Sequence, residues 1–320
     1  MARMIVGVLR GGPSSEYDLS LKTGAHMLAT LPEDSYDLRD IFIDKKGMWH
    51  VRGIPMEPAR ALAQMDVVLN ALHGGPGEDG TVQRILQRSG VRYPGSRPAA
   101  AALSLNKHRA GEALRNAGLH VPQSASFSLP SDRATGEMAR EVFAQFGPPY
   151  IVKPLAEGAG HGIQIAHTIV ELPHAIGDVL DRFGGALVQE YLRGDEASVG
   201  IIEGFRGQDL YALPVSQTIL PEGSAYFSRD HHIDAQAKHI VPSNFPHEMK
   251  LSIEEAARAA HQALGMMHFS RADFIVSRGK PYVLEVNAVP GLYPGASFPL
   301  ALEAVGSSTR EFLEHAISLA

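Results

Sequence analysis

The sequence predicts an α/β fold in which a parallel α/β domain is followed by α+β structure. Its length of 320 residues allows two or three domains of ordinary size. In the first hundred residues, apolar strand-like runs alternate with helical patterns, which is typical of a parallel sheet covered by helices. The strand-like runs are 4–9, 36–44 and 66–72, and the helical patterns are 14–31 and 81–89. Ser15, with Asp18 three residues later, resembles a capping box at the start of the first helical pattern. We therefore expect an N-terminal α/β domain over residues 1–97.

The rest of the chain predicts two α+β domains, over residues 98–192 and 193–320. The first contains a helical segment ended by a glycine, a strand–glycine loop–strand unit, a helix and a strand. The second contains strands, a loop-rich stretch at 221–246, a helix, a hairpin and a final helix. The corresponding residues are 98–119, 148–168, 171–183 and 186–192 in the first, and 196–204, 210–220, 252–265, 271–291 and 308–319 in the second.

Composition excludes several classes of protein. Apolar residues make up 44% of the chain, but no apolar run approaches the ~20 residues of a membrane helix. Without cysteine there are no disulfides or thiolate metal sites, and the fifteen histidines contain no H-E-x-x-H pattern. A net charge of −6 argues against nucleic acid as the main partner. The N-terminus passes straight into a strand-like segment, which is not the pattern of a signal peptide, and the absence of cysteine fits a cytoplasmic protein.

Two acids and an asparagine lie on the predicted hairpin 271–287. Strand side chains alternate between faces, so Glu285 and Asn287 share a face. With a three-residue turn at 278–280, Asp273 lies opposite Glu285 and Arg271 opposite Asn287. Alternation also predicts that Val283 lies on the face of Glu285.

A positive charge is needed between these acids, because like charges that face each other destabilise a sheet. One interpretation is an ion pair between Asp273 and Arg271. The other is a divalent cation held by Asp273, Glu285 and Asn287, since Mg²⁺ prefers carboxylate and amide oxygens. The hairpin by itself does not choose between them.

The segment 157–162, EGAGHG, has alternating glycines between two strand-like segments. This pattern predicts a hairpin tip rather than the strand-to-helix turn of a dinucleotide site. Its backbone N–H groups suit a flap over phosphates, although an ordinary hairpin loop has the same pattern. Lys153, at the end of the preceding strand, is a candidate phosphate ligand or half of a structural ion pair.

Four other residues could either bind a ligand or be surface or loop residues without such a role. Lys107 is either a phosphate ligand or a solvated lysine. The strand end at Glu190 could offer backbone groups to an adenine, and Glu196 could bind a ribose or lie on the surface. His73, beside a glycine-rich turn that precedes a helix start, is either a site residue or a loop histidine.

Together, in order along nearly the whole chain, these segments resemble the D-alanine–D-alanine ligase family of the ATP-grasp superfamily. The motifs that carry the resemblance are VLRGGPSSEYDLSLKTG, ALHGGPGEDGTVQ, YPGS with ALSLNK, IVKPLAEGAGHGI, VQEYLRGDEASVGI, RADFIV and LEVNAVPGL. The pair LHG…GEDGT and LEVN…PG at this separation is the most specific.

The resemblance implies a three-domain architecture in which the two α+β domains enclose ATP. It implies that ATP phosphorylates the carboxylate of a first D-alanine and that the amine of a second D-alanine attacks the acyl phosphate. It also implies two Mg²⁺ ions, with Mn²⁺ as an alternative, a role in peptidoglycan synthesis, and a homodimer.

Residue roles follow by position from the resemblance. The ATP ligands would be Lys107, Lys153, Gly158, Glu190, Leu192, Glu196 and Lys238, and the metal ligands Asp273, Glu285 and Asn287. The catalytic and substrate residues would be Glu16, His73, Arg271, Gly291, Ser297, Phe298 and His239. Among them Glu16 would bind the ammonium of the first D-alanine, and Arg271 with the backbone of Gly291 would stabilise the oxyanion.

The chain departs from the family pattern at two places. Ala159 and Gly160 replace a serine pair in the flap, and His239 replaces a tyrosine after the mobile-loop lysine. A cationic His239 would disfavour an amine and allow a hydroxy acid such as D-lactate as second substrate. Alternatively, His239 replaces the tyrosine as a hydrogen-bond donor while His161 fills the flap. The remaining rivals are a ligase that uses D-serine or another amino acid, and an inactive nucleotide-binding module.

Overall fold

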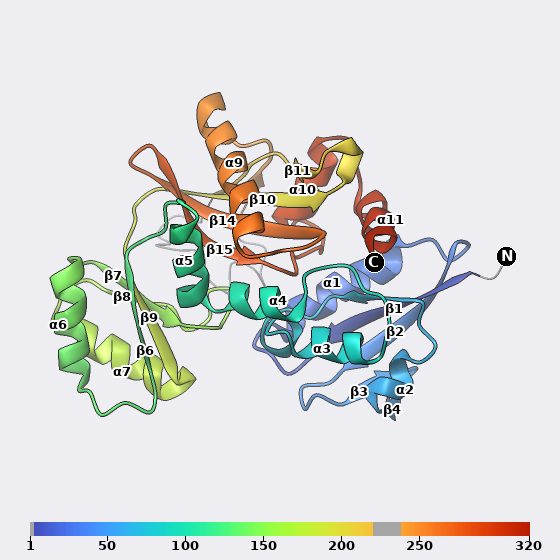
Figure 1. Ribbon diagram of the computed structural model, residues 1–320, viewed down its shortest axis with the longest axis horizontal. Coiled ribbons are helices and arrows are strands. Elements are labelled where there is room, and N and C mark those ends of the chain that lie inside the picture. Colours follow the sequence, from blue (N-terminus) through green and yellow to red (C-terminus); the bar gives the residue numbers. More distant parts are fainter. Residues whose placement is uncertain (1–2, 220–237) are drawn as a thin grey trace.

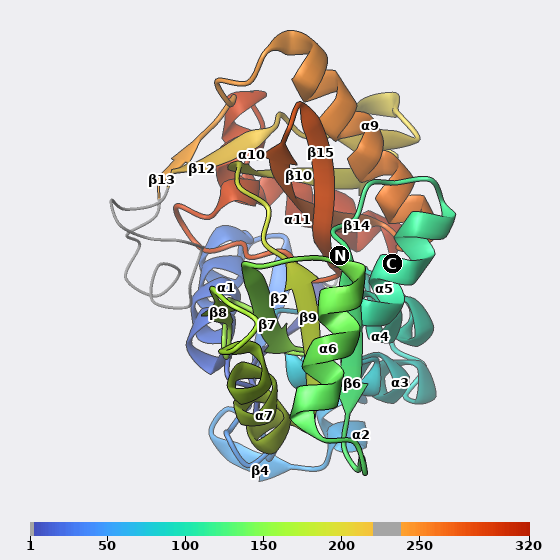
Figure 2. The same ribbon diagram turned by 90° about the vertical axis from the view of Figure 1, so that its left-hand side faces the viewer.

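In the computed structural model, the chain forms three sheets with helices packed against them. The structure describes residues 3–219 and 238–320, so much of the predicted loop 221–246 lies outside the described residues. Figures 1 and 2 show the N-terminal sheet and the central sheet at opposite ends of the molecule, with the C-terminal sheet beside both. The mixed α/β class predicted from the sequence is confirmed.

The N-terminal sheet has the strand order β4-β3-β2-β1-β5, with β1 parallel to both β2 and β5. Strands β3 and β4 extend it as an antiparallel edge that the sequence did not predict, because each has only three residues. Helix α1 covers one face with the C-terminal helix α11, and α2 and α3 cover the other. The elements are β1 (Met4–Gly11), α1 (Tyr17–Thr30), β2 (Tyr36–Ile43), β3 (Trp49–Val51), β4 (Ile54–Met56), α2 (Pro58–Leu62), β5 (Val67–Asn70), η1 (Gly75–Gly77) and α3 (Thr81–Arg88).

The central sheet has the order β6-β9-β7-β8, and α6 and α7 pack on it around a core that includes Val142, Tyr150 and Ile176. The strands β7 and β8 are antiparallel, so the glycine-rich segment is the tip of a hairpin as predicted. The elements are β6 (Ser124–Ser128), α6 (Thr135–Gln145), β7 (Tyr150–Pro154), β8 (Gln164–Ala166), α7 (Leu172–Phe183) and β9 (Gly185–Glu190).

The C-terminal sheet has the order β13-β12-β10-β14-β15, with β11 paired to β10. Helix α9 packs on one face together with α4 and α5, which share its core. The packing of α10 on β10 is close, because a Cβ at Gly200 would lie 2.5 Å from the Phe298 ring. The elements are α4 (Pro98–Leu105), α5 (Lys107–Asn116), β10 (Asp195–Glu203), η2 (Phe205–Gly207), β11 (Leu210–Ala212), β12 (Ser216–Ile219), β13 (Lys238–Ile240), α9 (His247–Ala263), β14 (Phe269–Ser277), β15 (Lys280–Asn287), α10 (Ser297–Ala304) and α11 (Thr309–Leu319).

Two local predictions were wrong. The segment 98–119 is two helices rather than one, because the Asn106 side chain caps α5 by accepting a hydrogen bond from the backbone N–H of Arg109. Ser15 does not cap α1, and its hydroxyl donates instead to the Glu157 carboxylate, 2.6 Å away. The hydrogen bond between Ser15 and Glu157 joins the N-terminal domain to the flap.

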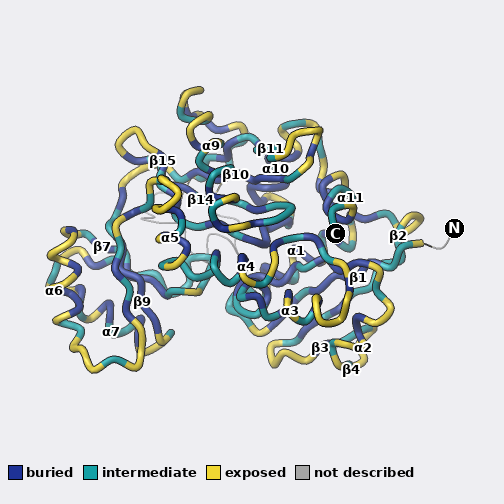
Figure 3. Tube along the Cα trace, in the orientation of Figure 1, coloured by how far each residue is buried: buried dark blue, intermediate teal, exposed yellow. Residues whose placement is uncertain are grey.

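Burial follows the sheets, since the buried residues run along the strands of all three (Figure 3). Within residues 3–219 and 238–320, the structure contains no helix long and apolar enough to cross a membrane.

Candidate active site

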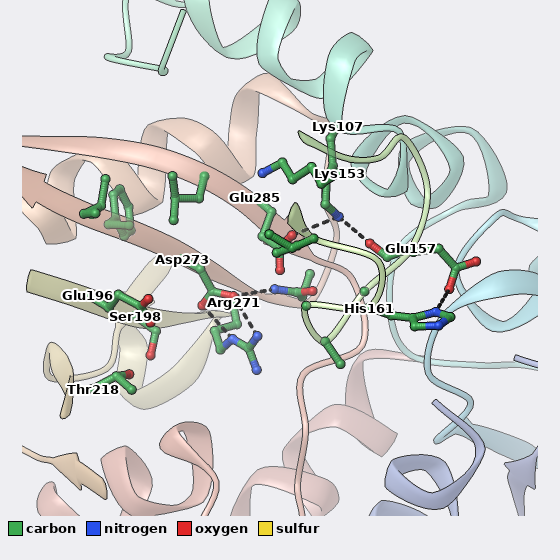
Figure 4. A pocket seen from close by; sticks show the side chains of 18 of the residues that line it. Lys107, Lys153, Glu157, His161, Glu196, Ser198, Thr218, Arg271, Asp273 and Glu285 are labelled. Carbon is green, nitrogen blue, oxygen red and sulfur yellow. Dashed lines mark hydrogen bonds and ion pairs between the residues drawn. The ribbon is translucent and has the colours of Figure 1, made fainter. Parts of the chain in front are cut away.

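A cavity of about 230 Å³ lies where the three sheets approach one another (Figure 4). Its wall combines the start of α1, the flap between β7 and β8, the end of β9, and the strands β10, β14 and β15. The predicted site residues that line it are Glu16, His73, Lys107, Lys153, Gly158, Glu190, Leu192, Glu196, His239, Arg271, Asp273, Glu285, Asn287, Gly291 and Ser297. Residues from distant parts of the sequence therefore meet in one cavity.

The predicted pairing of the acidic hairpin is confirmed, but the predicted turn was wrong. Asp273 faces Glu285 and Arg271 faces Asn287. The turn has two residues, Arg278 and Gly279, both with positive φ, as a type I′ turn requires. A β-bulge after Asp273 adds one residue to β15 and restores the register that a two-residue turn alone would shift.

The bulge also corrects the predicted faces of β15. Val283 does not share the face of Glu285: it is fully buried in the same core as Val286. Leu284, the extra residue, lines the cavity together with Glu285. The alternation fails because a bulge changes the phase of the side chains.

Each acid of the hairpin has its own cation (Figure 4). The Arg271 guanidinium donates two hydrogen bonds, of 2.8 and 2.7 Å, to Asp273, and Asn287 Nδ2 donates a third of 2.8 Å. Lys107 Nζ lies 3.0 Å from Glu285 Oε2. The ion-pair interpretation is therefore present in this structure, with Lys107 as a second cation that the sequence did not pair with Glu285.

The charges of Lys107, Lys153 and Glu285 set the electrostatics of this wall. Burial, together with the positive charge of Lys107, lowers the pKa of Lys153 to about 8. Although burial opposes it, the ammonium groups of Lys107 and Lys153 lower the pKa of Glu285 to about 2. Lys153 is 7% exposed and lines the cavity, so this buried cation suits an anionic ligand.

Glu16 lies across the cavity, under the flap. A Cβ on Gly158 would lie 2.3 Å from Glu16 Oε1, and one on Gly74 would lie 2.6 Å from it, so a side chain at either position would displace the Glu16 carboxylate. Burial and the negative charge of Glu78 raise the pKa of Glu16 to about 8. A carboxylate in this position gains strongly from a cationic ligand.

His73 is 5% exposed, and its Nε2 lies 2.8 Å from the Thr23 hydroxyl. Its Nδ1 lies 3.7 Å from Glu78 Oε1. The ring is thus fixed by its neighbours at the edge of the cavity, beside Glu16.

His239 lies on β13 opposite Thr218, whose hydroxyl is 3.3 Å from His239 Nδ1. Burial, assisted by the positive charge of Arg271, lowers the pKa of His239 to about 4. The ring is therefore neutral at pH 7. This finding contradicts the cationic His239 of the D-lactate hypothesis and favours a hydrogen-bonding role.

Two predicted residues are not among those that line the cavity. The ring of Phe298 packs in the core, 5.0 Å from that of Phe312, so its side chain does not face a substrate. Lys238 is exposed. Neighbouring Ser297, at the first position of α10, does line the cavity.

Several other residues that line the cavity were not predicted from the sequence. Glu157, Ser198, Thr218 and Tyr293 line the cavity as well. Ser198 and Thr218 lie opposite partners on neighbouring strands, Asp273 and Glu196. Only the pairing of β10 with β12 and β14 reveals this, because no sequence pattern specifies which strands become neighbours.

This fold and cavity define an ATP-grasp enzyme, in which a glycine-rich hairpin and two α+β sheets enclose the pocket. Sequence models described as the D-ala D-ala ligase N-terminus and C-terminus match residues 52–96 and 113–318. The chain belongs to the D-alanine–D-alanine ligase family.

Individual relatives support the same family assignment. A D-alanine–D-alanine ligase of Desulforudis audaxviator is 31% identical over 317 residues, covering 98% of each chain. The structure of a Bacillus anthracis D-alanine–D-alanine ligase complexed with ATP has a TM-score of 0.82 and 28% identity, over 99% of this chain and 97% of that one. The D-Ala:D-Ser ligase VanG of Enterococcus faecalis has a TM-score of 0.85 and 25% identity, over 99% of both chains.

Proposed function

We propose that this protein is an ATP-dependent ligase that joins two D-alanines to D-alanyl-D-alanine for peptidoglycan synthesis in the cytoplasm. The observation that carries the proposal is the pairing, in one cavity, of a cationic wall with a separate carboxylate. Lys107, Lys153 and Arg271 form the cationic wall, which suits a triphosphate, and Glu16 is placed for an ammonium group. Membership of the family supports the same activity.

The reaction needs an activated carboxylate, because a free carboxylate is a poor electrophile. The carboxylate oxygen of the first D-alanine attacks the γ-phosphorus of ATP, which gives an acyl phosphate and ADP. The amine of the second D-alanine then attacks the acyl carbon, loses a proton, and expels phosphate. Lys107 and Lys153 would neutralise phosphate charge, and Arg271 would stabilise the oxyanion of the tetrahedral intermediate.

Asp273, Glu285 and Asn287 would hold the Mg²⁺ ions, and their donor set fits, since carboxylate and amide oxygens are the ligands of this ion. Within the described residues no group of three His, Cys, Asp or Glu side chains forms a ligand cluster, so the metal site would also need phosphate oxygens. Held by these residues, Mg²⁺ would neutralise phosphate charge. Replacing Asp273 by Asn should increase the Mg²⁺ concentration needed for half-maximal activity, and an unchanged requirement would remove Asp273 from the metal site.

A second candidate differs only in the second substrate. Ala159, Gly160 and His239 remove polar groups that the family pattern places near that substrate, and the D-Ala:D-Ser ligase VanG is a structural neighbour. The neutral His239 argues against D-lactate, so D-serine is the stronger of these alternatives.

A substrate panel separates the candidates. Enzyme, ATP, Mg²⁺ and D-alanine are incubated with equal amounts of D-serine, D-lactate or L-alanine, and the products are identified by mass. We expect D-alanyl-D-alanine as the main product in each mixture. A main product that contains D-serine would support the second candidate, and the absence of any product with every amino acid would indicate an inactive nucleotide-binding module. We further propose a homodimer, which light scattering would test.

A further inference from the structure

The carboxylate of Glu157 joins the flap to the N-terminal domain. The Ser15 hydroxyl donates to Glu157 Oε2 over 2.6 Å, and His161 Nδ1 lies 3.2 Å from the same oxygen. An ionised carboxylate only accepts hydrogen bonds, so Nδ1 of His161 carries the proton and donates. One oxygen thus receives donors from the β1–α1 loop and from the far side of the flap, and Figure 4 shows the contact with His161.

The other side of the flap is held against α7. The His161 ring meets Phe183 edge-on, with centroids 5.3 Å apart. A Cβ at Gly162 would lie 2.7 Å from the Phe183 ring, so the flap passes close to this helix. His161 therefore touches both anchors: Glu157 through its nitrogen and Phe183 through its ring.

The same loop that carries Ser15 also carries Glu16. Gly158 packs on the Glu16 carboxylate, and Lys107 donates to the backbone carbonyl of Glu157 over 2.7 Å. A closed flap covers Glu16 and removes solvent from its carboxylate. An ammonium ligand offsets this cost, so it binds the closed flap in preference to the open one.

We propose that Ser15, Glu157 and His161 form a latch that couples amino-acid binding at Glu16 to nucleotide binding under the flap, with His161 as a positioning residue. The latch rests on the proposed function, because it takes an amino-acid ammonium and ATP as the ligands. Ala159 and Gly160, at the tip of the flap, carry no side-chain hydrogen-bonding group, so the latch residues fasten the flap from either side of that tip.

The latch is tested by calorimetric titration of a non-hydrolysable ATP analogue with Mg²⁺, in the absence and presence of saturating D-alanine. For the unchanged protein we expect D-alanine to tighten analogue binding about fivefold or more, and the analogue to tighten D-alanine binding by the same factor. Ser15→Ala should bring this factor close to one while the affinity for the analogue alone changes little. Ser15→Thr, which keeps the hydroxyl, should retain most of it.

His161 has a matched set of variants. His161→Phe keeps a ring against Phe183 but loses the donor, and His161→Gln keeps a donor but loses the ring. We expect the coupling to be lost in His161→Phe and largely rescued in His161→Gln. His174→Phe, at an exposed histidine of α7 outside the cavity, should leave the coupling unchanged.

Two results would overturn the latch: a coupling factor near one in the unchanged protein, or the same factor in Ser15→Ala and His161→Phe as in the unchanged protein. Dipeptide formation by the unchanged protein is measured in parallel. If the dipeptide forms but the coupling factor is unchanged in the Ser15 and His161 variants, the latch proposal is wrong and the proposed ligase function stands. If neither the analogue nor D-alanine binds, the proposed function fails as well.

Discussion

Replacing Glu285 by Gln tests the charge balance of the cationic wall. The Glu285 side chain is 26% exposed and Lys107 Nζ lies 3.0 Å away, so solvent screens this pair weakly. A pKa of about 2 in the folded protein, against 4.5 in the unfolded chain, corresponds to about 3 kcal/mol of stabilisation at pH 7. Because the folded-state pKa is the lower one, this stabilisation is complete above pH 4.5 and is lost as the pH falls towards 2.

The substitution removes the negative charge and leaves the ammonium groups of Lys107 and Lys153 without it. Urea denaturation of the ligand-free protein at pH 7 should show a loss of about 3 kcal/mol. Glu255→Gln, at an exposed glutamate of α9, is the control and should change stability by less than about 0.5 kcal/mol.

A double-mutant cycle assigns the effect to the pair. With Lys107→Met as the second change, we expect a coupling energy of about 2 kcal/mol between residues 107 and 285. A loss below about 1 kcal/mol for Glu285→Gln, together with additive effects in the cycle, would refute the claim that these charges hold each other in the folded protein.

Three further predictions concern the amino-acid side of the cavity. Glu16→Gln should stabilise the ligand-free protein by roughly 2–4 kcal/mol at pH 8 while weakening D-alanine binding, because a folded-state pKa of about 8 means that the wild-type protein loses stability between pH 4.5 and 8. Urea denaturation at pH 5 and pH 8 measures this difference in stability. A variant that is less stable than the wild-type protein at pH 8 would contradict the prediction. Gly158→Ala should raise the KM for the first D-alanine about tenfold or more, since its Cβ would lie 2.3 Å from Glu16 Oε1. The control Gly177→Ala, whose Cβ would make an ordinary 3.6 Å contact within α7 packing, should leave the KM unchanged and stabilise the protein by about 1 kcal/mol; equal KM values in the two variants would argue against the close approach of the flap. A neutral His239, with a pKa of about 4, predicts that His239→Gln leaves the change in the ratio of dipeptide to D-lactate ester between pH 8 and pH 6 unaltered, because that change then comes from the substrate amine alone. A smaller rise in ester towards pH 6 in His239→Gln than in the unchanged protein would restore the cationic alternative.

The sequence predicted best those features that depend on local pattern. Two strand-like runs around a turn predicted the acidic hairpin, and alternating glycines predicted the flap as a hairpin tip. Both depend on backbone geometry within a short segment.

Features that depend on tertiary contacts were predicted less well. The two-residue turn and the bulge cancel each other in the register, so the correct pairing followed from an incorrect turn, and the burial of Val283 was missed. The Lys107–Glu285 pair joins α5 to β15, and the contact of Ser15 with Glu157 joins the N-terminal domain to the flap. These contacts are set by the packing of sheets that lie far apart in the sequence, which periodicity does not encode.

Domain limits and residue roles remain predictions. The helices α4 and α5 share a core with the C-terminal sheet, and α11 packs with the N-terminal sheet. The three predicted domains are consecutive segments of the chain, but these helices pack on a sheet outside their own segment. A helix packs on whichever apolar face it can cover.

The most direct test of the central claim is the stoichiometry of the reaction with ATP, Mg²⁺ and D-alanine. Phosphate, ADP and dipeptide are measured in the same sample with and without D-alanine. The account predicts that ATP cleavage depends on D-alanine and that ADP, phosphate and D-alanyl-D-alanine form in equal amounts. ATP cleavage that is independent of D-alanine, or cleavage without dipeptide, would contradict it.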